Sequence, residues 1–177
     1  GIAGPYLLAT GRGDPRKNLG FLAGVLHTIR ARGRPAPALV VTGRPARRVH
    51  GRRDDAPAGA ILTGHVGDDE LRALYTGALA FVFPSRAEGF GRPPLEAMAC
   101  GTPALVAPYD GARELVGAAR VLPLAPAAWA DAIEALDRAR RPRGRPLIDM
   151  ARFSWDAAAL DEAEACRRAS RVARPVA

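Results

Sequence analysis

Residues 78–107 read ALAFVFPSRAEGFGRPPLEAMACGTPALVA, and they set the fold class of the chain. The stretch opens on Ala78–Phe83, an unbroken apolar run, and closes on a second such run, Ala104–Ala107. Apolar runs that are continuous rather than alternating are typical of strands buried on both faces of a parallel sheet. Between the two runs, Pro93 and Pro94 suit the first turn of a helix. The stretch therefore predicts a strand–helix–strand unit.

The same alternation continues on both sides of this unit. Short apolar runs predict further strands at Tyr6–Thr10, Ala38–Thr42, Ala60–Thr63 and Val121–Leu122. Helices are expected around Leu19–Ile29 with a stop at Gly33, from an N-cap at Asp68, at Glu114–Val116 before Gly117, around Trp129–Leu136, and over Trp155–Val172 after a cap at Ser154. Alternating strands and helices predict an α/β fold, a Rossmann-like parallel sheet with helices on both faces.

Length and composition indicate a single globular domain. The chain has 177 residues, of which 48% are hydrophobic and 25% charged, as is usual for a folded soluble domain. Its longest apolar run is far shorter than the roughly 20 residues that span a bilayer. The two cysteines, Cys100 and Cys166, form neither a metal-binding spacing nor a disulfide framework. We therefore expect a protein of the reducing cytoplasm.

The formal net charge is +8, which favours anionic partners. Lys17 is the only lysine among the 26 basic residues, so it stands out against 25 arginines. Basic clusters lie at Arg44–Arg53, inside a predicted loop over Arg44–Gly59, and at Arg138–Arg145. Such clusters are usually solvated faces. They could also contact an anionic membrane or a charged acceptor.

Ligands of parallel α/β sheets bind beyond the carboxyl ends of the strands, so the polar, glycine-rich segments that follow strands are the candidates. The first is Gly11–Asn18, GRGDPRKN. It lacks the third glycine of a dinucleotide fingerprint and the G-K-[ST] of a P-loop. Arg12 and Lys17 flank a predicted helix start, which is a favourable anion site. The alternative is a solvated loop with surface charge.

The second segment, Pro84–Gly101, carries two carboxylates. Glu88 lies in the loop, and Glu96 lies in the helix that follows two intervening glycines. Glu96 could accept hydrogen bonds from the vicinal hydroxyls of a ribose, and Glu88 could reach a sugar hydroxyl or a reacting centre. The alternative is that Glu96 only balances the helix dipole and that Glu88 is a loop charge. Ser85 has no G-x-S-x-G context, so it is not expected to be a nucleophile.

This second segment resembles the donor-site signature of retaining glycosyltransferases of family 4, the group 1 transferases of GT-B fold. The match runs through Glu88, Gly89, Phe90, Gly91, Pro93, Leu95, Glu96, Ala97, Met98, Ala99, Gly101 and Pro103. Gly11-Arg12 with Asp14–Leu19 resembles the first strand–helix turn of the family. Gly64-His65-Val66, followed by Glu70-Leu71 and Tyr75, resembles its middle stretch.

The resemblance implies a role for each matching residue. Arg12 and Lys17, beside Gly11, would hold the donor diphosphate, and Glu96 would bind the ribose. Glu88 would contact the transferred sugar near the reacting face, which makes it the catalytic candidate. The remaining donor-binding candidates are His65 and Val66 near the base, and Gly89, Phe90, Gly91 and Leu95 near the sugar and phosphates. Family members retain the anomeric configuration and require no metal, because cations and helix ends neutralise the leaving diphosphate.

The resemblance also implies that residues 1–177 are one lobe of a larger enzyme. A GT-B enzyme needs an N-terminal lobe for the acceptor, and the likeness covers the donor lobe alone, so we expect a fragment that is inactive by itself. Arg92 and Arg113 depart from the family pattern. Expected partners are a nucleoside-diphosphate sugar, the missing lobe and, peripherally, the inner face of an anionic membrane. The alternatives are a donor lobe that serves only as a scaffold and a non-catalytic basic module for nucleic acid or an anionic surface. Nucleic acid itself is not expected, because no aromatic residues interleave with the basic clusters.

Overall fold

A six-stranded sheet runs through the protein in the order β3-β2-β1-β4-β5-β6, and each neighbouring pair is parallel. The computed structural model describes residues 2–11, 13–43, 56–115, 120–139, 144–154, 162–164 and 167–168. The strands are β1 (Tyr6–Thr10), β2 (Ala38–Thr42), β3 (Ile61–Gly64), β4 (Ala80–Phe83), β5 (Ala104–Val106) and β6 (Arg120–Val121). The prediction of a parallel α/β sheet is confirmed.

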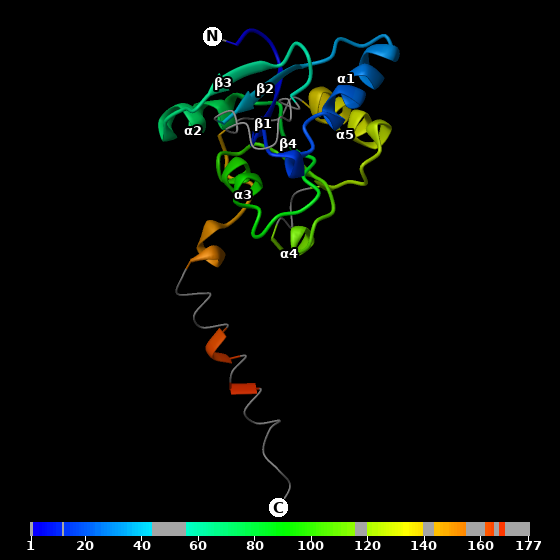
Figure 1. Ribbon diagram of the computed structural model, residues 1–177. Helices are drawn as coiled ribbons and strands as arrows, with labels where there is room; N and C mark the ends of the chain where they lie inside the picture. The colour runs from blue at the N-terminus through cyan, green and yellow to red at the C-terminus, as the bar shows by residue number, and fades with distance from the viewer. Residues whose placement is uncertain are drawn as a thin grey trace, which may run out of the picture.

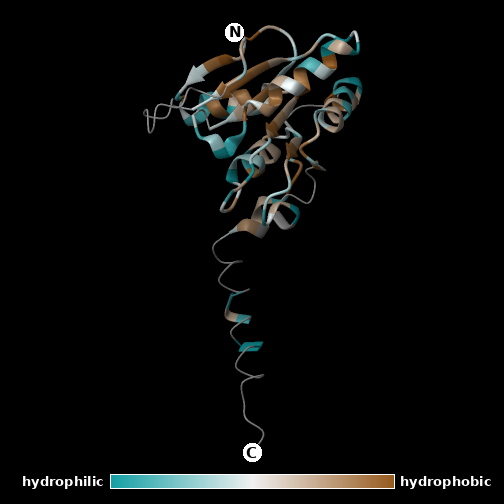
Figure 2. Ribbon diagram, turned by 45° about the vertical axis from the view of Figure 1, so that its right-hand side comes forward, coloured by the Kyte–Doolittle hydropathy of each residue, from teal (hydrophilic) through white to brown (hydrophobic). Residues whose placement is uncertain are grey.

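Helices connect the strands and cover both faces of the sheet (Figure 1). They are α1 (Phe21–Ala31), α2 (Asp68–Gly77), α3 (Arg92–Ala99), α4 (Ala112–Leu115) and α5 (Pro126–Ala139), with short 3-10 turns at η1 (Pro15–Lys17) and η2 (Met150–Phe153). The brown strands in Figure 2 run through the interior, and the teal segments lie on the outer helices and turns. This distribution is expected for a sheet that is covered on both sides.

Successive residues of β1, β2, β4 and β5 enter two different cores. Leu7 of β1 packs in a core with residues of α1 and α5, whereas Leu8 packs in a core with residues of α2 and α3. Both side chains are 0% exposed. In the first core, the Trp129 indole is fully buried and donates a hydrogen bond from Nε1 to the Pro123 carbonyl, at 2.8 Å. The continuous apolar runs of the sequence reflect this burial on both faces.

The ends of several elements differ from the prediction. Asp68 was expected to be an N-cap, but Gly67 is the cap and Asp68 is the first helical residue of α2. The reason is that Glu70 reaches back, and its Oε2 accepts a hydrogen bond from the Gly67 N–H at 3.0 Å. The strand expected from Ala78 begins at Ala80, because the Ala78 N–H still donates to the Tyr75 carbonyl and closes α2.

Expected strand ends differ by about one residue in β3, β5 and β6, which is within the ordinary uncertainty of such boundaries. Several expectations fall mainly or wholly outside the described residues, namely the loop and arginine cluster at 44–55, Gly117, the cluster core at 140–143, Cys166 and most of the helix at 155–172.

The strand order creates a switch point between β1 and β4. The chain adds strands in one direction from β1 through β2 to β3, and then crosses back to place β4 on the other side of β1. In parallel sheets of this kind, ligands usually bind beyond the carboxyl ends of the strands at such a switch point. The loops that leave β1 and β4 begin the segments Gly11–Asn18 and Pro84–Gly101 that the sequence singled out.

Candidate active site

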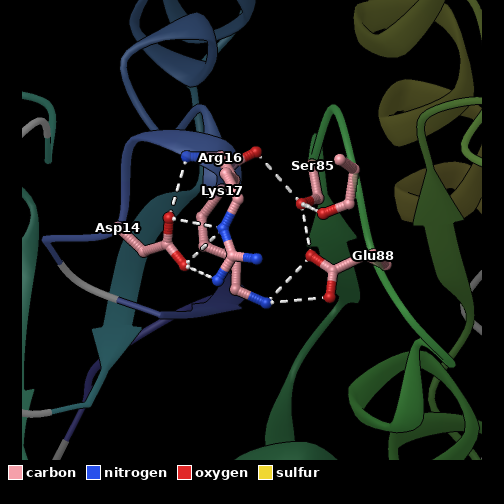
Figure 3. A network of polar contacts seen from close by, with 6 residues as sticks. Asp14, Arg16, Lys17, Ser85 and Glu88 are labelled. Carbon is pink, nitrogen blue, oxygen red and sulfur yellow. Dashed lines mark hydrogen bonds and ion pairs between the residues drawn. The ribbon is translucent and has the colours of Figure 1, made fainter.

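The loops after β1 and β4 are joined by backbone and side-chain hydrogen bonds (Figure 3). Asn18 Nδ2 donates to the Pro84 carbonyl at 3.2 Å, and the Arg86 N–H donates to the Arg16 carbonyl at 2.9 Å. Asn18 has φ 52°, a left-handed conformation that asparagine tolerates better than most residues. The two predicted segments thus form one connected surface at the carboxyl edge of the sheet.

Lys17 and Glu88 form an ion pair across the two loops. Lys17 Nζ lies 2.9 Å from Glu88 Oε1 and 3.1 Å from Oε2. The two side chains are only 18% and 12% exposed, so water screens the pair less than it would on an open surface. Lys17 Nζ also lies 4.9 Å from the centroid of the Phe83 ring, at the end of β4. The single lysine of the chain is therefore held by a carboxylate and by an aromatic face.

Ser85 is a second partner of Glu88. Its side chain is fully buried, and its hydroxyl donates to Glu88 Oε1. The Arg16 carbonyl also lies 3.0 Å from this hydroxyl, but the charged carboxylate is the stronger acceptor. Sequence reasoning excluded Ser85 as a nucleophile and assigned it no other role. Its position directly after a buried strand was the available signal.

Gly11 makes room for the Lys17 side chain. A Cβ at Gly11 would lie 2.6 Å from Lys17 Cγ and 2.8 Å from Cε, and Gly11 has φ +94°. Both the space and the backbone conformation therefore require glycine. The structure thus brings Gly11, Lys17 and Glu88 together. Arg12, the other predicted phosphate ligand, lies outside the described residues.

Asp14 and Arg16 shape the turn that carries Lys17. Asp14 caps η1, and its Oδ1 accepts a hydrogen bond from the Arg16 N–H at 2.9 Å. The Arg16 guanidinium also binds the carboxylate, at 2.7 Å from Nη2 to Oδ2. This side-chain hydrogen bond lowers the pKa of Asp14 below its ordinary value. Arg16 is thereby engaged in the turn, which leaves Lys17 as the cation directed at Glu88.

Glu96 lies on α3 and has a separate set of partners. The Tyr75 hydroxyl donates to Glu96 Oε2 at 3.1 Å, and Arg92 Nη2 lies 3.7 Å from Oε1. Tyr75 is buried, and this burial, more than the nearby charge of Glu96, raises the pKa of its phenol. A hollow of about 200 Å³ opens beside Glu96, between α2 and α3, and is lined by Asp68, Leu71, Arg72, Tyr75, Glu96 and Cys100. The Glu96 side chain is 39% exposed, so it remains accessible to a ligand.

The start of α3 offers few free N–H groups. The helix begins at Arg92 with Gly91 as its N-cap, so Pro93 and Pro94 occupy its first turn as expected. Proline has no N–H, however, and Gly91 and Arg92 are left as the donors of this helix end. Leu95 was predicted to bind the donor, but its side chain is 3% exposed and packs in the core with α2 and β4. Any contact of Leu95 with a donor is therefore left to its backbone.

The other predicted residues differ in how close they lie to the ion pair. Gly89 and Phe90 are exposed in the same loop as Glu88, and Phe90 is 50% exposed. His65 and Val66 follow β3, which β2 separates from β1. Val66 lines a broad hollow of about 630 Å³ against α2, together with Ile2, Gly4, Tyr6, Thr63, Glu70, Ala73, Leu74 and Gly77. His65 and Val66 are thus at the same edge of the sheet but not beside Lys17 and Glu88.

Two negative observations concern the described ranges. Within them, no group of three or more histidine, cysteine, aspartate and glutamate side chains is arranged to hold a metal ion. No helix in those ranges has both the length and the apolar character needed to cross a membrane.

Comparison with known families identifies a match over most of the chain. The family described as Glycosyl transferases group 1 matches residues 4–138. The solved structure of sucrose-phosphate synthase from Thermosynechococcus elongatus superposes with a TM-score of 0.70 and 25% sequence identity. That superposition covers 97% of this chain and 47% of the synthase. The fold is therefore GT-B-like.

Curated relatives align over shorter stretches. Serotype-specific mannosyltransferase WbdA of Escherichia coli is 51% identical over 57 residues, which are 32% of this chain and 7% of that protein. O-antigen chain mannosyltransferase B of Escherichia coli is 33% identical over 122 residues, which are 63% of this chain and 31% of that protein. The chain thus spans less than a third of the length of either relative.

Proposed function

Because this chain belongs to the group 1 glycosyl transferases, we propose that it is the donor-binding domain of a retaining enzyme that transfers a sugar from a nucleoside-diphosphate sugar. The observation that carries the proposal is the Lys17–Glu88 pair at the switch point of the sheet, 2.9 Å between Nζ and Oε1. A cation and a carboxylate that are both largely shielded from water match a donor that presents a diphosphate beside a polyhydroxyl ring.

In this proposal Lys17 binds the diphosphate of the donor, and Arg12 assists it. Negative charge accumulates on the diphosphate as the bond to the sugar breaks, and a cation fixed at that point stabilises the charge. Gly11 allows Lys17 to cross the turn at the required place, since a Cβ there would collide with its side chain. The N–H groups of Gly91 and Arg92 add donors from the start of α3. This arrangement would need no metal ion.

The two carboxylates are assigned to the two sugars of the donor. Glu96, held by Tyr75 and open to solvent, would accept hydrogen bonds from the ribose hydroxyls. Glu88 would contact the transferred sugar near its reacting face. The backbone at Gly89 and Phe90, which lies in the same exposed loop, would contribute further hydrogen bonds.

A diphosphate bound at Lys17 would compete with Glu88 for the three N–H donors of the ammonium group. In the free protein both Glu88 oxygens lie within 3.1 Å of Lys17 Nζ. Donor binding therefore redistributes one cation between a carboxylate and a diphosphate. Glu88, which is then less fully paired with Lys17, can accept hydrogen bonds from the hydroxyl groups of the sugar.

We also propose the identity of the transferred sugar and the place of this chain in a larger enzyme. Mannose is the first candidate for the sugar, because several relatives are named mannosyltransferases. Residues 1–177 would form one lobe, and a second lobe would supply the acceptor and the opposite wall of the cleft. The share of each relative that the chain covers, 7% of one and 31% of another, supports this division. We expect the chain alone to bind the donor without useful turnover.

Isothermal titration calorimetry with UDP, GDP and ADP, and with UDP-glucose, GDP-mannose and ADP-glucose, tests the proposal. At least one of the nucleotides should bind, and Lys17→Met should weaken it by roughly tenfold to a hundredfold, because hydrogen bonds to charged groups contribute about 1.5–3 kcal/mol. Arg30→Ala is the matched control, since it also removes one positive charge but lies in the last turn of α1. That turn is at the opposite edge of the sheet, and the affinity should not change.

Absence of binding for all six compounds would contradict the proposed function. So would equal losses of affinity in Lys17→Met and Arg30→Ala, because the effect would then reflect net charge. Salt-dependent binding of an oligonucleotide without nucleotide-sugar binding would instead favour the basic-module alternative.

A further inference from the structure

Tyr109 has a buried hydroxyl without a partner among the described residues. It lies three residues after β5, at the same edge of the sheet as Lys17 and Glu88. The residue is 7% exposed, and its hydroxyl oxygen is shielded from solvent and makes no hydrogen bond to any described atom. Buried polar groups are nearly always paired, and leaving one unpaired is unfavourable. A phenylalanine would fill the same space without that cost.

The hydroxyl is directed at the loop that carries Glu88. A Cβ at Gly91 would lie 2.2 Å from the Tyr109 oxygen, and Gly91 has φ +78°. The ring of Tyr109 contacts the ring of Phe83 edge to face, with centroids 6.0 Å apart. Phe83 in turn lies under Lys17 Nζ. Phe83 thus lies between Tyr109 and Lys17, and the Tyr109 hydroxyl packs against Gly91, three residues after Glu88.

The Tyr109 hydroxyl is a hydrogen-bond donor, and it lies close enough to Glu88 to be affected by the charge of the carboxylate. Burial and the negative charge of Glu88 raise the pKa of Tyr109 to about 12, so the phenol keeps its proton at neutral pH. Two donors already engage Glu88 in the free protein, namely Lys17 and Ser85. An ionised carboxylate has about four acceptor positions, so a third donor can be added once Lys17 turns to a diphosphate.

We propose that Tyr109 is a positioning residue for Glu88, whose hydroxyl donates to the carboxylate in the donor-bound state and holds it toward the transferred sugar. The inference rests on the proposed function, because the diphosphate is what draws Lys17 away. This role also explains the presence of a tyrosine here, because its hydroxyl makes no hydrogen bond to any described atom. Tyr109 lies outside the sequence signature that contains Glu88 and Glu96.

The test compares Tyr109→Phe with the wild-type chain in two measurements. The first is the melting temperature of the free protein, which should be equal or higher in Tyr109→Phe, because the variant removes an unpaired polar group. The second is the affinity for each nucleotide sugar of the calorimetric series, divided by the affinity for its nucleoside diphosphate. This ratio isolates the contribution of the sugar, and it should fall about tenfold in Tyr109→Phe, as expected for loss of a hydrogen bond to a charged group.

Tyr6→Phe is the matched control for the loss of a tyrosine hydroxyl. The Tyr6 hydroxyl donates to the Leu74 carbonyl at 2.8 Å, away from the ion pair. Its removal should lower the melting temperature and leave the affinity ratio unchanged. A Glu88→Gln background provides a second control, since Tyr109→Phe should have little further effect once the carboxylate is gone.

The outcomes separate this inference from the proposed function. An unchanged ratio in Tyr109→Phe, with normal binding by the wild-type chain, overturns the role of Tyr109 and leaves donor binding intact. A clear drop in the melting temperature of Tyr109→Phe shows that the hydroxyl already has a partner in the free protein, and it also overturns the role. A full tenfold effect in the Glu88→Gln background shows that Tyr109 does not act through Glu88. Absence of any nucleotide binding by the wild-type chain overturns both proposals together.

Discussion

Breaking the Lys17–Glu88 ion pair should reduce stability by an amount that its partial burial determines. At an effective dielectric constant of 20, opposite charges about 4 Å apart attract by about 4 kcal/mol. Both side chains are less than a fifth exposed, so removing them from water offsets much of that attraction. We expect a net coupling energy of about 1–2 kcal/mol, above the median of about 0–1 kcal/mol for exposed pairs.

A double-mutant cycle with Lys17→Met and Glu88→Gln isolates this coupling. Methionine keeps a long side chain across Gly11, and glutamine keeps an oxygen that can accept from Ser85. The free energy of unfolding would be measured by urea denaturation for the four proteins. For a chain of this size, 1 kcal/mol corresponds to about 2–4 °C in melting temperature, so each single variant should be visibly less stable.

The Arg92–Glu96 pair provides the matched control cycle. Its atoms lie 3.7 Å apart, and its side chains are 79% and 39% exposed. The cycle with Arg92→Met and Glu96→Gln should give a coupling energy of no more than about 0.5 kcal/mol, and salt should reduce it further. Equal coupling energies for the two pairs would contradict the view that burial shields Lys17 and Glu88 from water.

Three further substitutions test neighbouring features of the site and the core. Gly11→Ala should displace Lys17, because a Cβ would lie 2.6 Å from Lys17 Cγ. Calorimetry should then show a loss of nucleotide affinity similar to that of Lys17→Met. Normal affinity would mean that nucleotide binding does not require the Lys17 side chain to lie against Gly11. Tyr75→Phe removes the hydrogen bond to Glu96 and should weaken nucleoside-diphosphate binding about fivefold to tenfold, which equals about 1–1.4 kcal/mol. An unchanged dissociation constant would show that Tyr75 does not support the contact between Glu96 and the ribose. Trp129→Ala should cost about 3–5 kcal/mol in urea denaturation, because the indole is fully buried, and a loss below about 1 kcal/mol would contradict its place in the core.

Local sequence patterns predicted the elements of the fold well and their contacts only in part. Apolar runs such as Ala104–Ala107 locate strands because each face of a parallel strand must be buried. They do not state which strands pair. The neighbourhood of β1 and β4 brings Lys17 within 2.9 Å of Glu88, although 71 residues separate them in the sequence. That contact follows from the crossover of the chain, which no local pattern encodes.

The residues that sequence reasoning missed are distinguished by their contacts and burial. Ser85 and Tyr109 lie outside the matched motif, and only the structure shows that the Ser85 hydroxyl donates to Glu88 and that the Tyr109 hydroxyl packs against Gly91. The expected cap at Asp68 was wrong for a similar reason, since Glu70 reaches the Gly67 N–H and shifts the helix start by one residue. Leu95 matched the motif, yet helical periodicity turns its side chain into the core. A motif therefore marks a segment more reliably than it assigns each side chain.

A structure of the chain with a nucleotide sugar bound tests most directly whether Lys17, Glu88 and Glu96 form the donor site. We expect diphosphate oxygens about 2.7–2.9 Å from Lys17 Nζ, ribose hydroxyls at Glu96, and the transferred sugar at Glu88. A nucleotide sugar seated elsewhere, for example in the hollow beside Val66 and α2, with Lys17 still bonded to both oxygens of Glu88, would contradict this assignment.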